Sequence, residues 1–154
     1  MSELPPKPPR ASLTEISDLT YPPDANIHGS VFGGVILAMV DKAAAVCAMR
    51  HSGKPCVTVA MDRVEFLVPI RVGDYVTAEA RLNYVGKSSM EIGVEVYAEN
   101  LQTGARKHTN TCIVTMVAVD QNGRPSPVPG LILETPEDKS RHAAAESRRK
   151  ARKT

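Results

Sequence analysis

The feature that most constrains the fold is the apolar segment VILAMVDKAAAVCAMR, residues 35–50. It follows Gly33 and Gly34, and on a helical wheel it is apolar on every side, with only Asp41 and Lys42 interrupting it before its last residue. A helix with this distribution is one that a protein buries. At about 1.5 Å per residue it is too short to cross a bilayer. The segment therefore predicts the central helix of a globular core.

The rest of the chain is typical of β-strands. Residues 56–67 are rich in β-branched side chains, and residues 76–84 and 90–98 alternate apolar with polar positions. Such alternation indicates half-buried antiparallel strands. Residues 111–119 are apolar on both faces and are expected centrally in a sheet or at an interface. A further β-like segment, residues 12–20, precedes the helix.

This order of elements predicts an α+β fold, in which one antiparallel sheet wraps around one apolar helix. Thr135 and Pro136, followed by two acidic residues, predict the start of a C-terminal helix. We divide the chain into a flexible proline-rich leader (1–11), one domain (12–134) and a basic C-terminal helix or tail (135–154). A chain of this length cannot cover both faces and the edges of such a sheet, so we expect at least a homodimer.

Composition excludes several classes of protein. No stretch reaches the roughly 20 apolar residues of a membrane span, and the N-terminus has no apolar core of a signal peptide. We therefore expect a cytoplasmic protein with no membrane partner. Cys47, Cys56 and Cys112 form no CxxC pair and are expected to be reduced thiols. The four histidines have no metal-ligand spacing, so we expect no metal.

The net charge of +2 is concentrated at the C-terminus, where seven Lys or Arg residues follow position 138. Charge alone leaves three interpretations open: a solvated tail, an arm that binds the phosphates of a nucleotide ligand, or a nucleic-acid contact. Because aromatic residues make up only 4% of the chain, it has no wide stacking platform for single strands.

Three positions are candidates for chemistry. Asp41 lies mid-helix among apolar residues, where a carboxylate is either paired or functional. Gly33 and Gly34 open the helix, where free N–H groups can form an oxyanion-type site or the glycines can serve tight packing. Asn26, in the preceding loop, is by itself typical of a turn residue. No GxSxG, Walker A or GxGxxG motif is present.

The run PPDANIHGSVFGGVILAMVDKAAAVCAMRHSG contains Asn26, Gly29 and Phe32 in the pattern N-x-x-G-x-x-F-G-G, with Asp41 seven residues after the last glycine. This run, together with VTVAMDRVEFLVPIRVGDYVTAEARLNYVGKSSMEI further on, resembles the hotdog-fold acyl-CoA thioesterases, close to the YciA-type and cytosolic acyl-CoA hydrolase group. The resemblance extends over about residues 12–120. Some relatives carry His in place of Phe32.

The resemblance implies hydrolysis of fatty acyl-CoA to a free acid and CoA, with no cofactor beyond the CoA of substrate and product. It also implies dimers, possible as trimers of dimers, with active sites at the dimer interface. Asn26 and Asp41 would be the catalytic pair, contributed by opposite subunits. The N–H of Gly34, beside Gly33, would polarise the thioester carbonyl. Asp41 would act as general base or as nucleophile, and the sequence leaves both routes open.

The resemblance further places CoA binding in two segments. The turn after residue 85 would hold the pantetheine or nucleotide end through Gly86, Lys87, Ser88 and Ser89. Basic residues of the tail, Arg148 and Arg149, would meet the CoA phosphates. A non-catalytic acyl-CoA sensor or carrier on the same fold is the alternative function. Acyl chain length and oligomer size beyond a dimer are not determined by these motifs.

Overall fold

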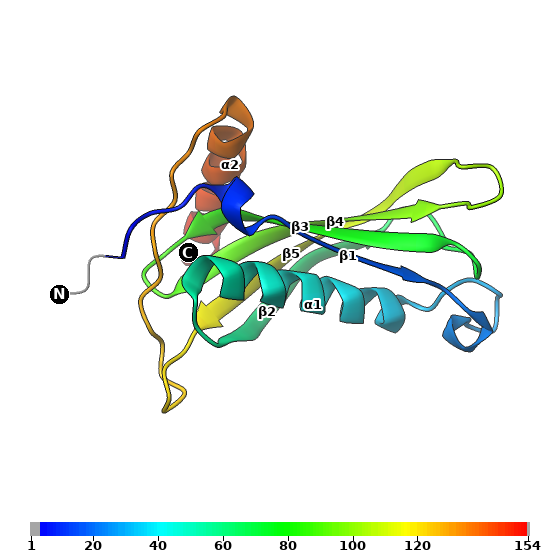
Figure 1. Cartoon of the computed structure of the whole chain (residues 1–154), viewed down its shortest axis with the longest axis horizontal. Helices are drawn as coiled ribbons and strands as arrows, with labels where there is room; N and C mark the ends of the chain where they lie inside the picture. Colours follow the sequence, from blue (N-terminus) through cyan, green and yellow to red (C-terminus); the bar gives the residue numbers. More distant parts are fainter. Residues whose placement is uncertain (1–3, 154) are drawn as a thin grey trace.

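The computed structural model describes residues 4–153. It contains five strands, two α-helices and two short 3-10 helices, in the order η1 (Pro9–Ser12), β1 (Thr14–Leu19), η2 (Pro22–Asp24), α1 (Gly33–Ser52), β2 (Cys56–Phe66), β3 (Tyr75–Val85), β4 (Ser89–Glu99), β5 (Arg106–Ala118) and α2 (Pro136–Lys153). The predicted α+β class, with one antiparallel sheet packed on one long helix, is confirmed (Figure 1).

The strands form a single antiparallel sheet in the order β1-β3-β4-β5-β2. β3, β4 and β5 follow one another as hairpins, whereas β2 pairs with the last strand and so forms an edge. The alternation predicted for β3 and β4 holds, because the apolar positions from Val76 to Leu82 and from Met90 to Ala98 are buried. β5 is an interior strand between β4 and β2, as its two apolar faces predict, but it begins at Arg106, several residues earlier than the apolar run.

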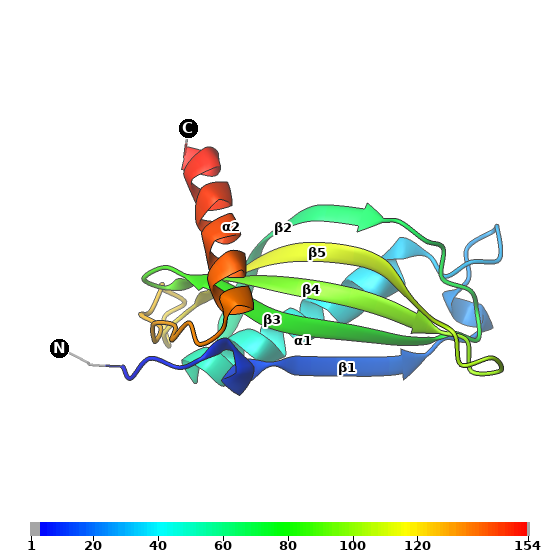
Figure 2. The ribbon, with the colours of Figure 1, turned by 90° about the horizontal axis from the view of Figure 1, so that it is seen from above.

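α1 lies along one face of the sheet, and its sheet-facing side is the centre of the core (Figure 2). Ile36, Val40 and Ala44 on that side are at most 1% exposed. The opposite side differs from the all-round burial that the helical wheel predicts, since Ala38 and Lys42 are exposed. The reason is geometric: one five-stranded sheet covers one side of a helix. The far side of α1 is therefore left open in the single chain.

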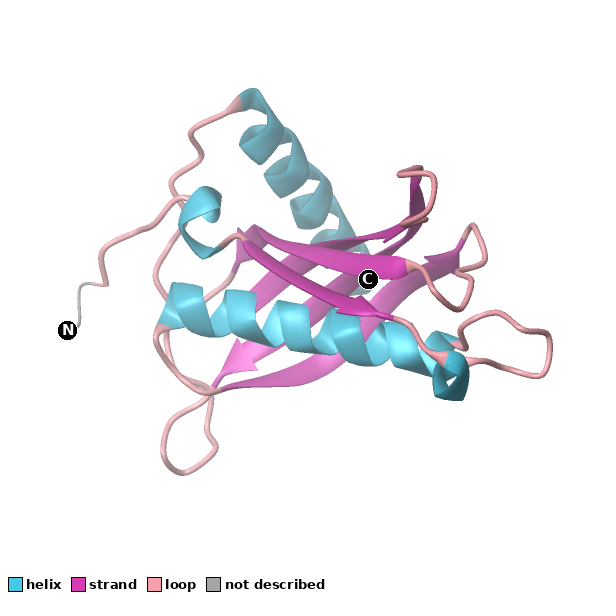
Figure 3. Cartoon of the chain, turned by 45° about the vertical axis from the view of Figure 1, so that its right-hand side comes forward, coloured by secondary structure: helices cyan, strands magenta, loops and turns pink. Residues whose placement is uncertain are grey.

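α2 packs on the opposite face of the sheet from α1 (Figures 1 and 3). Its predicted start is confirmed, since the hydroxyl of Thr135 accepts a hydrogen bond from the N–H of Asp138 at 3.0 Å. The Asp138 carboxylate in turn accepts the N–H groups of Glu134 and Thr135. Arg81 of β3 lies 3.6 Å from Glu137, which ties the first turn of the helix to the sheet. The helix therefore starts over β3 and runs across the sheet.

The N-terminal segment makes more defined contacts than a proline-rich leader predicts. The N–H of Lys7 donates to the carbonyl of Gly130 at 3.1 Å, and its ammonium donates to the carbonyl of His51 at 3.0 Å. His51 is fully buried at the end of α1, and its Nε2 lies 2.7 Å from the carbonyl oxygen of Pro129. Residues 7, 51 and 129–130 thus tie together the leader, α1 and the segment before α2.

No helix of the described residues is long and apolar enough to span a membrane.

Candidate active site

Asp41 lies in the third turn of α1, on the side of the helix that turns toward β2, and is half-buried. The hydroxyl of Thr58, on β2, donates to its Oδ1 at 2.6 Å, a short bond of the kind that a carboxylate accepts. No cation of the described residues forms an ion pair with Asp41. The carboxylate is therefore oriented by a hydroxyl and remains available to accept a proton or attack.

Gly33 and Gly34 form the first turn of α1. Phe32, the N-cap residue, provides no side-chain cap, and within residues 4–153 neither glycine N–H forms a hydrogen bond. A Cβ on Gly34 would lie 3.0 Å from the Phe32 ring, and one on Gly33 would lie 3.1 Å from the Phe66 ring. The glycines permit close packing of the aromatic rings, and their N–H groups are free donors at the positive end of the helix dipole.

Asn26 holds the loop before α1 in shape. Its Oδ1 accepts the N–H groups of His28 at 2.8 Å and Ser30 at 3.2 Å, and its Nδ2 donates to the Ser30 hydroxyl at 3.1 Å. This is the turn role that Asn commonly fills. Within the described part of one chain, no hydrogen bond joins Asn26 to Asp41. The structure of a single chain therefore does not bring the two predicted catalytic residues together.

The predicted CoA-binding turn meets the C-terminal helix. The turn closes through the N–H of Gly86, which donates to the Ser89 carbonyl at 2.8 Å. Arg149 of α2 donates to the Ser89 hydroxyl at 3.3 Å, and its guanidinium lies 5.2 Å from the centre of the Tyr84 ring. A Cβ on Gly86 would meet that guanidinium, so a larger residue there would displace the end of the Arg149 side chain. The two segments predicted separately for CoA binding are thus adjacent.

Arg148 has a different environment. Its Nε and Nη2 donate to both carboxylate oxygens of Glu91 on β4, at 3.1 and 2.7 Å. The Glu91 side chain is only 5% exposed and also accepts the amide of Asn83 at 3.0 Å. The hydrogen bonds that Arg148 donates to the Glu91 carboxylate raise the pKa of Arg148. Arg148 therefore anchors α2 to the sheet. Nothing in the sequence signals this partner, because Glu91 occupies an ordinary polar position in the alternating pattern of β4.

A basic depression of about 340 Å³ opens between α2 and β2, with the guanidinium groups of Arg63, Arg148 and Arg152 in its lining. Arg152 lies 3.1 Å from the Asp62 carboxylate. Arg63 has a φ of 52° at an irregularity of β2, a backbone conformation that is uncommon outside glycine. This bulge departs from regular strand geometry at the point where β2 faces the C-terminal helix.

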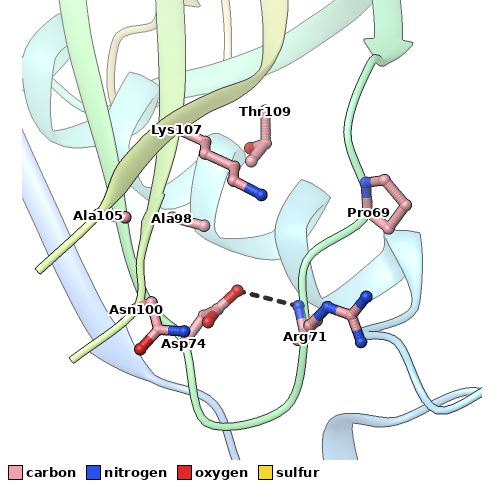
Figure 4. A pocket seen from close by; sticks show the side chains of 8 residues that line it. All are labelled: Pro69, Arg71, Asp74, Ala98, Asn100, Ala105, Lys107 and Thr109. Atoms are coloured by element: carbon pink, nitrogen blue, oxygen red, sulfur yellow. Dashed lines mark hydrogen bonds between the residues drawn. The ribbon is translucent and has the colours of Figure 1, made fainter. Parts of the chain in front are cut away.

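Another depression, of about 140 Å³, lies between the end of the β4–β5 hairpin and the loop before β3 (Figure 4). Lys107 points into it, and the Asp74 carboxylate across from Lys107 accepts the N–H of Arg71 at 3.0 Å, while the Arg71 guanidinium points away. None of the predicted site residues lines this depression. We therefore do not assign the chemistry to it.

Other side chains offer no competing centre. In the described chain, no three His, Cys, Asp or Glu side chains are grouped so that they could hold a metal ion. All three cysteines are free. Cys47 and Cys112 are buried, and burial raises the pKa of Cys47 to about 11, so that thiol is a poor nucleophile.

Comparisons with known proteins match this chain to thioesterases and acyl-CoA thioester hydrolases. The thioesterase superfamily profile matches residues 28–105. An uncharacterized acyl-CoA thioester hydrolase of Bacillus subtilis, YkhA, is 42% identical over 86% of this chain and 77% of its own. The cytosolic acyl coenzyme A thioester hydrolase of Mus musculus is 34% identical over 94% of this chain, which spans only 39% of the mouse protein.

Solved structures agree with these relatives. An apo-hexameric acyl-CoA thioesterase superposes with a TM-score of 0.92, at 40% identity and 96% coverage of both chains. The acyl-CoA hydrolase of Staphylococcus aureus, solved with butyryl coenzyme A and coenzyme A, superposes with a TM-score of 0.87, at 34% identity and with 96% and 93% coverage.

The Staphylococcus aureus enzyme has also been solved as three alanine variants, of an asparagine, an aspartate and a threonine. In that chain the three positions are 15 and 17 residues apart, the same spacings that separate Asn26, Asp41 and Thr58 here. The match includes Thr58, which sequence reasoning missed because a threonine in a β-branched strand has no distinguishing signal. Its hydrogen bond to Asp41 appears only once β2 lies beside α1.

Proposed function

This chain belongs to the thioesterase superfamily and is a hotdog-fold acyl-CoA thioester hydrolase of the YciA-type and cytosolic acyl-CoA hydrolase group, and from that premise we propose how its residues carry out the reaction. The observation that carries the proposal is the position of Asp41. Its carboxylate is oriented by the hydroxyl of Thr58 on β2, and Asp41 itself lies on α1, the helix that presents free N–H groups at its start.

In the proposed reaction, the thioester carbonyl oxygen accepts hydrogen bonds from the N–H groups at Gly33 and Gly34. These donors stabilise the negative charge that develops on this oxygen. Asp41 then acts by one of two routes. As general base it takes a proton from water while the water oxygen bonds to the carbonyl carbon. As nucleophile its own oxygen forms that bond, and water later hydrolyses the mixed anhydride. In both routes the carbon–sulfur bond breaks and CoA leaves as a thiolate, which takes up a proton.

We propose that Asn26 and Asp41 meet across a dimer interface. Two features of the single chain support this arrangement. The side of α1 away from the sheet is open, and β2 is an unpaired edge. Val57 and Val59 of that edge are 47% and 56% exposed, although they are apolar. A second copy against β2 would cover both features, and trimers of such dimers would match the hexameric relative.

The CoA moiety is proposed to lie against the turn from Gly86 to Ser89, including Lys87 and Ser88. Arg149 is the better placed of the two predicted cations, because among residues 4–153 its guanidinium forms no ion pair and contacts the Ser89 hydroxyl and the Tyr84 ring. Arg148 is also predicted to bind a CoA phosphate, but its guanidinium is already ion-paired with Glu91 and would have to keep that ion pair while it binds phosphate. We propose no cofactor beyond CoA, no metal and no nucleic-acid partner.

We also propose a cytoplasmic location. The mouse relative is named cytosolic, and the three free cysteines suit a reducing compartment.

The test is release of thiol, followed with DTNB, from acyl-CoAs of two to sixteen carbons. We expect Asp41→Asn to lower turnover about a hundredfold or more while the protein stays folded. Asp18→Asn is the matched control, since Asp18 is an exposed carboxylate on the other edge strand, β1. Light scattering on the eluting protein measures the oligomer.

Two results of this assay would contradict the proposed function. Wild-type turnover that survives in Asp41→Asn removes Asp41 from the mechanism. Absence of turnover on every ester, with CoA still bound, replaces hydrolysis by the sensor or carrier function.

A further inference from the structure

An apolar pocket of about 200 Å³ opens beside the N-terminus of α1. Its walls come from four segments: the loop before α1, the first turn of α1 with Gly33 and Ile36, Phe66 at the end of β2, and Val68 and Ile70 of the loop that follows β2. Ile36 and Ile70 are 1% and 4% exposed and form the inner wall, whereas Phe66 is 51% exposed and stands at the rim. The pocket is thus an apolar recess with one aromatic side chain at its mouth.

The backbone holds the walls of this recess together. The N–H of Val31 donates to the carbonyl of Ile70 at 2.7 Å, and Ser30 forms a β-bridge with Arg71. These bonds connect the loop before α1 to the loop after β2. The Ser30 hydroxyl, which belongs to the only polar side chain in the lining, accepts a hydrogen bond from Asn26. The recess is therefore contiguous with the loop that carries Asn26.

We propose that this recess holds the acyl chain of the substrate and that Phe66 limits the length of chain it accepts. The proposal rests on the proposed function. Gly33 lines the recess, and its free N–H lies where the thioester carbonyl is expected. The acyl chain is bonded directly to that carbonyl, so it must leave the site through an adjoining space. The recess is such a space, and an apolar lining suits an alkyl chain.

The size of the recess limits how much of an acyl chain it can cover. Pockets for drug-sized ligands usually hold about 300–1,000 Å³, and this one is smaller. The Phe66 ring packs closely against Gly33: a Cβ at position 33 would lie 3.1 Å from the ring carbon Cζ and would push the ring aside by a few tenths of an ångström. Removing the ring would open the recess toward β2. Each methylene newly covered is worth about fourfold in binding, from about 0.8 kcal/mol per buried CH₂.

The experiment compares kcat/KM for butyryl-, hexanoyl-, octanoyl- and decanoyl-CoA. Phe66→Ala enlarges the recess and should raise the decanoyl-to-butyryl ratio of kcat/KM about tenfold or more. Val68→Phe fills it from the loop that follows β2 and should lower that ratio by a similar factor. Leu67→Ala is the matched control, because Leu67 is the next residue, is 59% exposed and does not line the recess. It should leave the ratio within about threefold of wild type.

The outcomes separate this proposal from the function on which it rests. A wild-type protein without thioesterase activity refutes the function. An active wild type whose ratio is unchanged in both Phe66→Ala and Val68→Phe refutes the acyl recess. An equal shift in Leu67→Ala also refutes it, because the effect would then belong to the β2 edge in general. If Phe66→Ala does not fold, Val68→Phe decides the result alone.

Discussion

Arg148→Met tests whether this arginine anchors α2 to the sheet. The substitution removes two hydrogen bonds to Glu91, of 3.1 and 2.7 Å, and leaves a carboxylate that is 5% exposed with only the Asn83 amide. Breaking a buried ion pair typically costs about 3–5 kcal/mol. A quarter of the Arg148 side chain is in contact with water, so we expect about 3 kcal/mol, at the lower end of that range.

The assay is urea unfolding followed by circular dichroism at one fixed protein concentration, since assembly also stabilises the fold. Replacing both partners, as Glu91→Leu with Arg148→Met, should recover most of the loss, because no buried charge is then left alone. Arg149→Met is the control. Its side chain donates to the Ser89 hydroxyl at 3.3 Å and lies over the Tyr84 ring, but its removal leaves no buried charge unpaired, so we expect a loss of about 1 kcal/mol, clearly smaller than in Arg148→Met.

Two results would refute the reasoning. One is an unchanged unfolding midpoint in Arg148→Met. The other is an equal loss of stability in Arg148→Met and in the double variant, which would show that the helix, and not the ion pair, depends on Arg148. A rise in KM for acyl-CoA in Arg149→Met, with no more than this small change in stability, would assign Arg149 to CoA binding.

Thr58→Val, which removes the donor to Asp41, should lower kcat about tenfold with little change in KM, and Thr58→Ser should restore it; steady-state kinetics of the two variants decide this. Burial lowers the pKa of His51, so its contribution to stability is full above the unfolded value of about 6.5 and is lost as the pH falls through the lowered folded value. Urea unfolding from pH 7.5 to 5 should therefore show a steeper loss in wild type than in His51→Gln, and equal slopes would contradict it. Gly33→Ala should reduce kcat/KM much more in wild type than in Phe66→Ala, because the added methyl group meets the ring; additive effects in this double-mutant cycle would show that the two do not touch.

Local patterns in the sequence were enough to predict most elements. The alternation through Val76–Leu82 and Met90–Ala98 reports which side of a strand is buried, and that depends on neighbours two residues away. Thr135 and Pro136 predicted the start of α2 because capping is also a local interaction. The spacing of Asn26, the glycine pair and Asp41 was enough to suggest the family, because these polar and glycine positions lie close together in the sequence, in one loop and the helix that follows it.

Only the tertiary structure decided which distant segments meet. β2 follows α1 in the chain but pairs with β5, so Thr58 comes to lie beside Asp41 and Phe66 beside Gly33. Arg148 and Arg149 are neighbours in sequence, yet Arg148 binds the buried carboxylate of Glu91, whereas Arg149 binds the Ser89 hydroxyl at the β3–β4 turn. Such contacts depend on strand order and on the path of α2, which arise from burial summed over the whole sheet. Local periodicity contains no information about that sum, and this is the physical reason that the elements were predictable and their partners were not.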